Sequence, residues 1–218
     1  MPSTRYQKIN AHHYRHIWVV GDIHGEYQLL QSRLHQLSFF PKIDLLISVG
    51  DNIDRGPESL DVLRLLNKPW FTSVKGNHEA MALEAFETGD GNMWLASGGD
   101  WFFDLNDSEQ QEAIDLLLKF HHLPHIIEIT NDNIKYAIAH ADYPGSEYLF
   151  GKEIAESELL WPVDRVQKSL NGELQQINGA DYFIFGHMMF DNIQTFANQI
   201  YIDTGSPNSG RLSFYKIK

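Results

Sequence analysis

Aspartate, asparagine and histidine residues recur along this sequence shortly after apolar runs, most of them beside a glycine. The side chains concerned are Asp22, His24, Asp51, Asn77, His140 and His187. Divalent metal ions accept carboxylate and amide oxygens and imidazole nitrogens as ligands, and one carboxylate can bridge two ions. The sequence has no cysteine, which excludes thiolate ligands and thiolate nucleophiles. These residues therefore predict a site for two divalent cations.

The apolar runs before these residues indicate the strands that must position them. In the first third of the chain, three such runs alternate with two helical patterns. The runs span 17–20, 44–49 and 70–74, and the helical patterns fall at 30–37 and 57–66. A β-α-β-α-β order of this kind is typical of parallel strands, with ligands beyond their carboxyl ends. We expect the metal-competent residues to converge on that edge of the sheet.

The second half of the chain predicts two hairpins and a helix over 109–120. The paired apolar runs are 126–130 with 134–139, around Asn131-Asp132-Asn133, and 193–196 with 201–203, around Asn198-Gln199. Antiparallel strands are therefore expected to dominate this half. No repeat or long linker marks a domain boundary, so we interpret residues 1–218 as a single domain.

Composition excludes several classes of protein. The chain has 17 basic and 29 acidic residues and a formal net charge of −12, which opposes association with nucleic acid. Hydrophobic residues at 43% supply a large core, so the chain is not disordered. The N-terminus is too polar for a signal peptide, and no run approaches the 18 apolar residues of a membrane span. We expect a cytoplasmic protein with no membrane partner.

Five short motifs that contain these residues occur in a fixed order along the chain. They are GDIHG at 21–25, GDNIDRGP at 50–57, GNHE at 76–79, HAD at 140–142 and GH at 186–187. In this order they resemble the phosphoprotein phosphatase family of metallophosphoesterases, most closely its small bacterial and phage lambda type. The resemblance covers about residues 17–205. It implies an α/β metallophosphoesterase (calcineurin-like) fold of two packed mixed β-sheets flanked by helices. It also implies phosphorylated proteins as substrates, hydrolysed at phosphoserine or phosphothreonine, with a lesser activity on phosphotyrosine.

The resemblance also implies a role for each residue. One metal ion would be held by Asp22, His24 and Asp51, and a second by Asp51, Asn77, His140 and His187. Arg55 would bind the phosphate, and His78, oriented by Asp54, would protonate the leaving oxygen. Two divalent cations carry four positive charges, and two ligand carboxylates cancel two of them, which leaves a net charge of about +2. This charge would lower the pKa of a bridging water, and the resulting hydroxide would attack phosphorus directly. We expect Mn²⁺, with Ni²⁺, Fe²⁺, Zn²⁺ and Mg²⁺ as alternatives.

Three positions depart from the usual pattern of the family. Met188 replaces the threonine of GHT, Asp142 replaces the glycine of HAG, and Val163 stands where the phage type has a second arginine. Because Arg165 lies two residues further on, we expect it to be a second substrate contact.

The nearest alternative function is a diadenosine tetraphosphatase, since that related family shares GDIHG and the metal ligands. Its members usually lack the first aspartate of DRG, which is present here as Asp54 and favours the protein phosphatase. A phosphodiesterase of the wider superfamily would show GHxH, but position 189 is methionine. A binding module with a vestigial site would need a missing ligand, and none is missing.

Two further features of the sequence are not assigned to the metal site or to the acid. Asp203, in an Asp-Thr-Gly sequence, is interpreted as a turn residue. Trp94 and Trp101 bracket Gly98-Gly99, where they could rim a substrate groove or simply pack.

Overall fold

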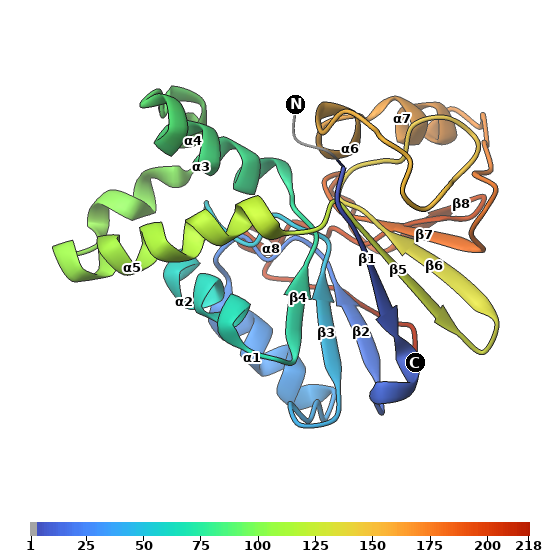
Figure 1. Ribbon diagram of the computed structural model, residues 1–218, viewed down its shortest axis with the longest axis horizontal. Helices are drawn as coiled ribbons and strands as arrows, with labels where there is room; N and C mark the ends of the chain where they lie inside the picture. Colours follow the sequence, from blue (N-terminus) through green and yellow to red (C-terminus); the bar gives the residue numbers. More distant parts are fainter. Residues whose placement is uncertain (1–3) are drawn as a thin grey trace.

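The computed structural model describes residues 4–218, in which two β-sheets pack against each other with helices outside them (Figure 1). The smaller sheet has the order β10-β2-β3-β4, formed by Phe214–Lys216, Ile17–Val20, Leu45–Ser48 and Phe71–Ser73. β2, β3 and β4 are parallel, with Ile17 opposite Leu45 and Leu46 opposite Phe71. The parallel β-α-β-α-β order predicted from the apolar runs is confirmed.

The larger sheet has six strands in the order β1-β5-β6-β7-β9-β8. They are β1 (Tyr6–Asn10), β5 (Ile126–Asn131), β6 (Ile134–Ile138), β7 (Tyr182–Phe185), β8 (Gln194–Phe196) and β9 (Gln199–Tyr201). The pairs β5·β6 and β8·β9 are antiparallel, but β1·β5, β6·β7 and β7·β9 are parallel. The prediction that antiparallel strands dominate is therefore wrong, because long connections bring parallel neighbours together without any hairpin signal.

The two predicted hairpins differ in how well the sequence located their turns. Asp132 and Asn133 have φ of 50° and 66°, the left-handed pair that a two-residue hairpin requires. In the second hairpin, β9 begins at Gln199, earlier than predicted. Asn198 lies in this turn, and its side chain accepts from the N–H of Ile177 at 3.1 Å and donates to the carbonyl of Ile177 at 2.7 Å. A distant backbone contact therefore helps to set this turn.

Helices cover the outer face of the smaller sheet and extend to one side as an arm (Figure 1). The connecting helices are α1 (Tyr27–Gln36), α2 (Ser59–Leu63) and η2 (Arg64–Asn67); the helical arm is α3 (Asn77–Thr88), α4 (Asn92–Ala96), η3 (Gly99–Asp104), α5 (Asp107–Leu117) and η4 (Leu118–His122). The short helices elsewhere are η1 (Ala11–His13), α6 (Ser157–Leu160), α7 (Asp164–Leu170) and α8 (Ser206–Ser209). Within residues 4–218, no helix combines the length and apolarity needed to cross a membrane.

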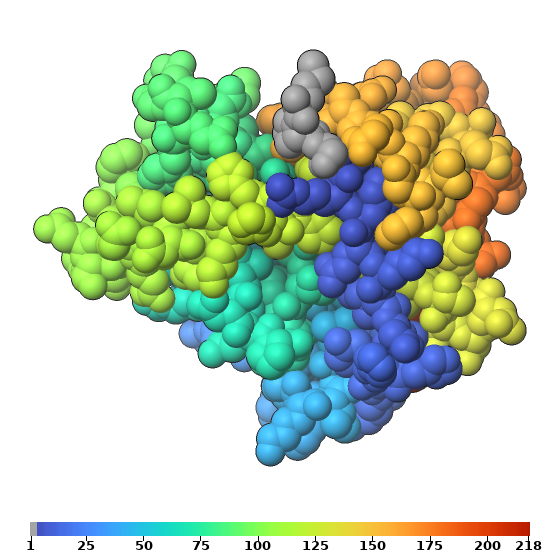
Figure 2. All heavy atoms as spheres, viewed as in Figure 1, coloured from blue at the N-terminus to red at the C-terminus, as the bar shows by residue number. Residues whose placement is uncertain are grey.

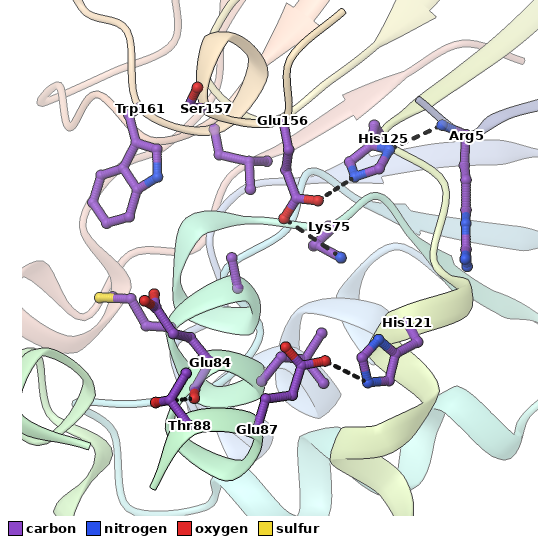
Figure 3. Close-up of a pocket in the computed structure, with 14 residues that line it drawn as sticks. Arg5, Lys75, Glu84, Glu87, Thr88, His121, His125, Glu156, Ser157 and Trp161 are labelled. Carbon is purple, nitrogen blue, oxygen red and sulfur yellow. Dashed lines mark hydrogen bonds and ion pairs between the residues drawn. The ribbon is translucent and has the colours of Figure 1, made fainter. Parts of the chain in front are cut away.

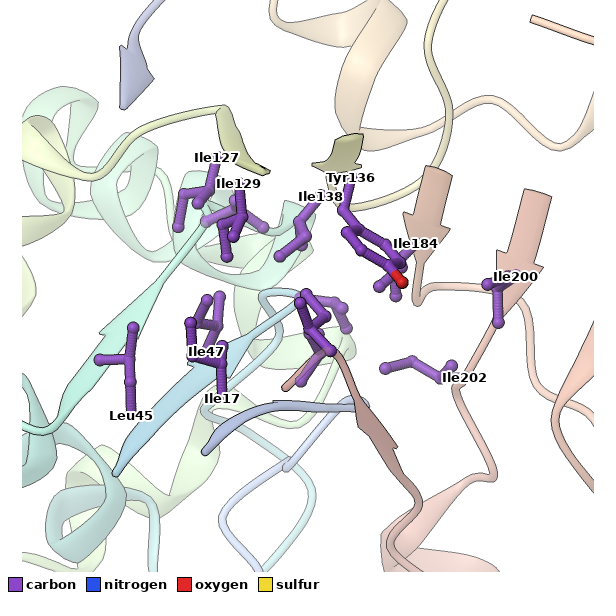
Figure 4. Close-up of a cluster of buried hydrophobic side chains, with 14 of the residues drawn as sticks. Ile17, Leu45, Ile47, Ile127, Ile129, Tyr136, Ile138, Ile184, Ile200 and Ile202 are labelled. Carbon is purple, nitrogen blue, oxygen red and sulfur yellow. The ribbon is translucent and has the colours of Figure 1, made fainter. Parts of the chain in front are cut away.

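Aliphatic side chains fill the space between the two sheets (Figure 4). Because side chains alternate along a strand, Leu45 and Ile47 point to this core, whereas Leu46 points to the outer helices. The larger sheet contributes Ile127 and Ile138, among others. The shared core fixes the ends of strands from both sheets relative to each other. β1, blue in Figure 2, lies on the surface beside the yellow β5–β6 hairpin.

Candidate active site

Loops at the carboxyl ends of β2, β3, β4, β6 and β7 bring the metal-competent residues together. Two sets of ligand atoms lie within 4.8 Å of one another, His24–Asp51–His78 and Asp51–His140–His187. Asn77 Oδ1 adjoins the second set, 2.7 Å from His140 Nε2 and 3.1 Å from His187 Nδ1. Asp51 is common to both sets, which is the placement that a bridging carboxylate requires.

Two of these histidines are oriented as metal ligands. His24 Nδ1 lies 2.9 Å from the carbonyl oxygen of Ile53, and His140 Nδ1 lies 2.8 Å from that of Val49. Because a carbonyl oxygen can only accept, each Nδ1 carries the hydrogen and each Nε2 presents a lone pair to the site. Burial lowers the pKa of His24 to about 3 and also lowers that of His140, so both rings are neutral. A neutral imidazole held by a carbonyl is a form that binds metal ions.

Glu79 is a buried carboxylate to which the sequence analysis assigned no role. Its oxygens accept the backbone N–H groups of Gly76 and Asp51 at 2.8 Å and of Asn52 at 2.7 Å. Glu79 therefore caps the start of α3 and holds Asp51 in a left-handed conformation with φ of 50°. Burial, and then the charge of Asp51, raises the pKa of Glu79 to about 7. The sequence does contain a signal for this cap, since a glutamate three residues after a helix N-cap is a known capping pattern.

Two further buried aspartates of the site, Asp22 and Asp203, lie close enough for their charges to repel each other and Asp51. Burial, followed by the charges of Asp203 and Asp51, raises the pKa of Asp22 well above its usual value. Asp22 lies in neither set of converging ligand atoms and accepts the backbone N–H of His187 at 3.0 Å. Asp203 accepts the N–H of Gly205 at 2.7 Å, consistent with a turn residue, and burial raises its pKa to about 6. A cation among these carboxylates would offset their crowded negative charge.

A histidine–aspartate pair lies next to the converging ligands. His78, in the first turn of α3, places Nδ1 2.6 Å from Asp54 Oδ2. Burial opposes a charge on His78, but the carboxylates of Asp51 and Asp54 outweigh it and raise its pKa. Asp54 Oδ1 accepts the indole N–H groups of Trp94 at 2.9 Å and Trp101 at 2.8 Å. Burial raises the pKa of Asp54, although its hydrogen bonds with His78, Trp101 and Trp94 act in the opposite direction. Because indole N–H groups can only donate, the Asp54 oxygens act as acceptors in these contacts.

Arg55 reaches the same place from an exposed position. Its Nη1 lies 2.9 Å from His24 Nε2, and its Nη2 lies 3.0 Å from His78 Nε2. The two ends of its planar fork therefore face a predicted metal ligand and the predicted acid. Such a fork can hold two oxygens of one phosphate.

Arg165 is held by a different set of contacts from Arg55, so its role as a second substrate contact stays a prediction. Its side chain is 8% exposed, and Nε donates to Asp142 Oδ1 at 2.9 Å. Nη2 donates to the carbonyls of Tyr143 at 3.0 Å and Gly145 at 2.6 Å, and Nη1 to Gln175 at 3.4 Å. Asp142, which replaces the usual glycine of HAG, thus supplies the carboxylate that binds Arg165.

A pocket of about 480 Å³ lies between α3 and α6, and none of the predicted site residues lines it (Figure 3). Several of its charged side chains are paired with one another. Glu156 is 3.5 Å from Lys75 and 3.1 Å from His125, and Glu87 is 3.2 Å from His121. The converging ligands and the acid pair are therefore separate from this pocket.

Comparison with known proteins shows that this chain is similar to phosphatases. The calcineurin-like phosphoesterase family matches residues 15–190. The chain is 60% identical to serine/threonine-protein phosphatase 2 of Salmonella typhimurium, over 100% of both chains. It is 44% identical to serine/threonine-protein phosphatase 1 of that organism, over 100% of this chain and 99% of the relative.

Relatives with the alternative activity are more distant. A symmetrical bis(5'-nucleosyl)-tetraphosphatase of Erwinia tasmaniensis is 32% identical over 57% of this chain and 43% of its own length. The crystal structure of a protein described as a diadenosine tetraphosphatase superposes with a TM-score of 0.73, covering 98% of this chain and 94% of that one. At 23% identity, this likeness shows the shared fold alone.

Proposed function

The chain belongs to the calcineurin-like phosphoesterase family, and we propose that it is a protein phosphatase that hydrolyses phosphoserine and phosphothreonine. The observation that carries the proposal is the 2.6 Å contact between His78 Nδ1 and Asp54 Oδ2, with Arg55 beside His78 Nε2. A serine alkoxide is a poor leaving group, so its departure requires an oriented acid. The full-length relatives named as serine/threonine phosphatases support the same substrate class.

The donor set supports two divalent cations. We assign Asp22, His24 and Asp51 to one ion, and Asp51, Asn77, His140 and His187 to the other. Once bound, such ions supply the positive charge that attracts the phosphate dianion and the hydroxide that attacks it at neutral pH. Oxygen and imidazole ligands without thiolate are compatible with Mn²⁺, which we propose as the metal.

The residues of the chain perform the remaining steps. The Arg55 fork binds two phosphate oxygens and orients the ester for in-line attack. Once the Arg55 fork holds the phosphate instead of donating to Nε2, at 3.0 Å here, a protonated His78 gives its Nε2 proton to the departing serine or threonine oxygen. Asp54 holds Nδ1–H and stabilises the protonated ring. A dinucleotide tetraphosphate would leave as a phosphate, a far better leaving group, so its hydrolysis would not need this pair. We propose phosphorylated cytoplasmic proteins as the substrates.

A comparison of two substrates tests the proposal. With Mn²⁺ present, kcat/KM for a phosphoserine protein should exceed that for diadenosine tetraphosphate by at least about tenfold, or about 1.4 kcal/mol. Phosphotyrosine protein should be hydrolysed more slowly than phosphoserine protein. The opposite ranking of phosphoserine and dinucleotide would assign the chain to the tetraphosphatases and leave the fold and ligand set unchanged.

A further inference from the structure

Two tryptophans of the helical arm donate hydrogen bonds to one catalytic carboxylate. Trp101 Nε1 lies 2.8 Å from Asp54 Oδ1, and Trp94 Nε1 lies 2.9 Å from Oδ1 and 3.1 Å from Oδ2. Trp101 is 8% exposed and Trp94 is 3% exposed. Their rings pack edge to face, with 6.2 Å between the ring centroids. Both indoles pack in the buried cluster of the helical arm, which fits the packing interpretation, and in addition both donate their N–H groups to Asp54.

The two indoles determine which way the Asp54 carboxylate faces. The terminal torsion of an aspartate side chain has a broad energy minimum, so neighbours must fix its orientation. Here both indoles donate to Oδ1, and Trp94 also contacts Oδ2, which is directed at His78 Nδ1, 2.6 Å away. Because indole N–H groups have no lone pair to offer, they hold Asp54 as an acceptor for the Nδ1 hydrogen of His78.

The turn between the two tryptophans also contacts the neighbouring arginine. The carbonyl of Gly98 accepts the backbone N–H of Arg55 at 3.1 Å. Gly98 has φ of 103°, and a Cβ there would lie 2.8 Å from the Arg55 nitrogen. A Cβ at Gly99 would lie 2.6 Å from the indole of Trp94. Both glycines are needed because the turn passes between Arg55 and Trp94, which accounts for the glycine pair between the tryptophans.

We propose that Trp94 and Trp101 are positioning residues for acid catalysis, holding Asp54 so that it orients His78 toward the leaving oxygen. The inference rests on the proposed function. In the step concerned, the bond from phosphorus to the serine oxygen breaks as the bond to the attacking oxygen forms. The His78 Nε2 proton passes to the departing serine oxygen. The tryptophans touch Asp54 and not the substrate, so they act on the rate of this proton transfer.

Trp94→Phe and Trp101→Phe test the proposal, because each keeps an aromatic ring and removes the N–H donor. Each variant should lower kcat for a phosphoserine peptide by roughly tenfold, within the range of general acid catalysis. KM and metal content, measured by mass spectrometry, should not change. The loss on p-nitrophenyl phosphate should be clearly smaller, because nitrophenolate leaves without a proton. Either variant alone suffices if the other does not fold.

Two controls separate positioning from structure. Trp70→Phe makes the same exchange at a tryptophan that packs against Phe39 and Phe71, and it should leave both substrates unaffected. In an Asp54→Ala background, Trp101→Phe should cause little further loss, because the carboxylate it holds is gone. Equal losses on both substrates, or a full additional loss in that background, would overturn the inference. An unaltered enzyme that is inactive on phosphoserine would instead overturn the proposed function.

Discussion

Replacing Arg165 by alanine distinguishes a structural role from a substrate contact. The Arg165–Asp142 pair is buried, with 8% and 7% exposure, and joins Nε to Oδ1 at 2.9 Å. Alanine would leave the Asp142 carboxylate without its cation and the carbonyls of Tyr143 and Gly145 without their donor. Breaking a buried pair from one side costs about 3–5 kcal/mol of folding free energy. At about 2–4 °C per kcal/mol for a chain of this size, the Tm should fall by roughly 6–20 °C.

The assay pairs thermal unfolding with kinetics measured well below the Tm of the variant. For Arg165→Ala we expect the lower Tm and a nearly unchanged KM for a phosphoserine peptide. Arg55→Ala is the matched control: its side chain is exposed at the site, so it should leave Tm close to the original while kcat/KM falls. The double change Arg165→Met with Asp142→Leu should recover part of the lost stability, because no buried charge is then left unpaired.

The refuting result is equally specific. If Arg165→Ala kept its Tm and raised KM strongly, the guanidinium would reach the substrate in solution. The assignment of Asp142 as its structural partner would then be wrong, and the second phosphate contact predicted from the sequence would be supported.

Three further predictions address the metals, the phosphate contact and stability against acid. Asp51→Ala should lose metal at both positions, measured by mass spectrometry, since Asp51 belongs to both ligand sets; full occupancy would contradict a bridging role. Arg55→Lys should lower kcat/KM by about 10- to 100-fold, because a single ammonium cannot replace the bidentate fork; a change within error would contradict the phosphate contact. Burial acts to raise the pKa of Asp44, but hydrogen bonds from Arg15 and from backbone N–H groups lower it below its usual value. The Asp44 carboxylate therefore stabilises the fold above its unfolded pKa of about 3.9 and loses that contribution as pH falls through the lower folded value. In denaturant titrations, the unfolding free energy of the unaltered protein should fall more steeply below about pH 4 than that of Asp44→Asn. Equal slopes of unfolding free energy against pH would show that the Arg15–Asp44 pair contributes nothing to stability.

The sequence predicted the convergence of His24, Asp51, His140 and His187 because their positions follow from local structure, whereas Asp22 lies outside both ligand sets. Asp22 and Asp51 come directly after parallel strands, and the carboxyl ends of such strands share one edge of a sheet. Glycine and a following polar residue mark each of these strand-to-loop transitions, so a short window contains the whole signal. The same reasoning located His140 and His187 after β6 and β7, although the parallel pairing of those two strands was not foreseen.

Contacts between distant side chains could not be predicted in this way. Arg165 was expected at the substrate because its neighbours in sequence resemble a phosphate-binding segment. Its partner Asp142 lies 23 residues away, and a periodic pattern does not reveal such a pairing. The hydrogen bond from Trp101 to Asp54 spans 47 residues, and β1 meets β5 across more than half the chain. Burial and hydrogen-bond partners, which decide these roles, depend on the assembled tertiary structure.

The proposed metal ligands and the proposed acid pair are positioned by different parts of this fold. The converging ligands follow strands whose inner faces share the core between the sheets, whereas Trp94 and Trp101 belong to the buried cluster of the helical arm. The two parts meet at the start of α3, where Asn77 faces His140 and the adjacent His78 faces Asp54. Because Glu79 caps this same turn and also binds the backbone of the segment carrying the bridging carboxylate, one helix terminus sets both arrangements. The order of the GNHE motif agrees with this geometry: Asn77 is the proposed metal ligand, His78 the proposed acid, and Glu79 the cap.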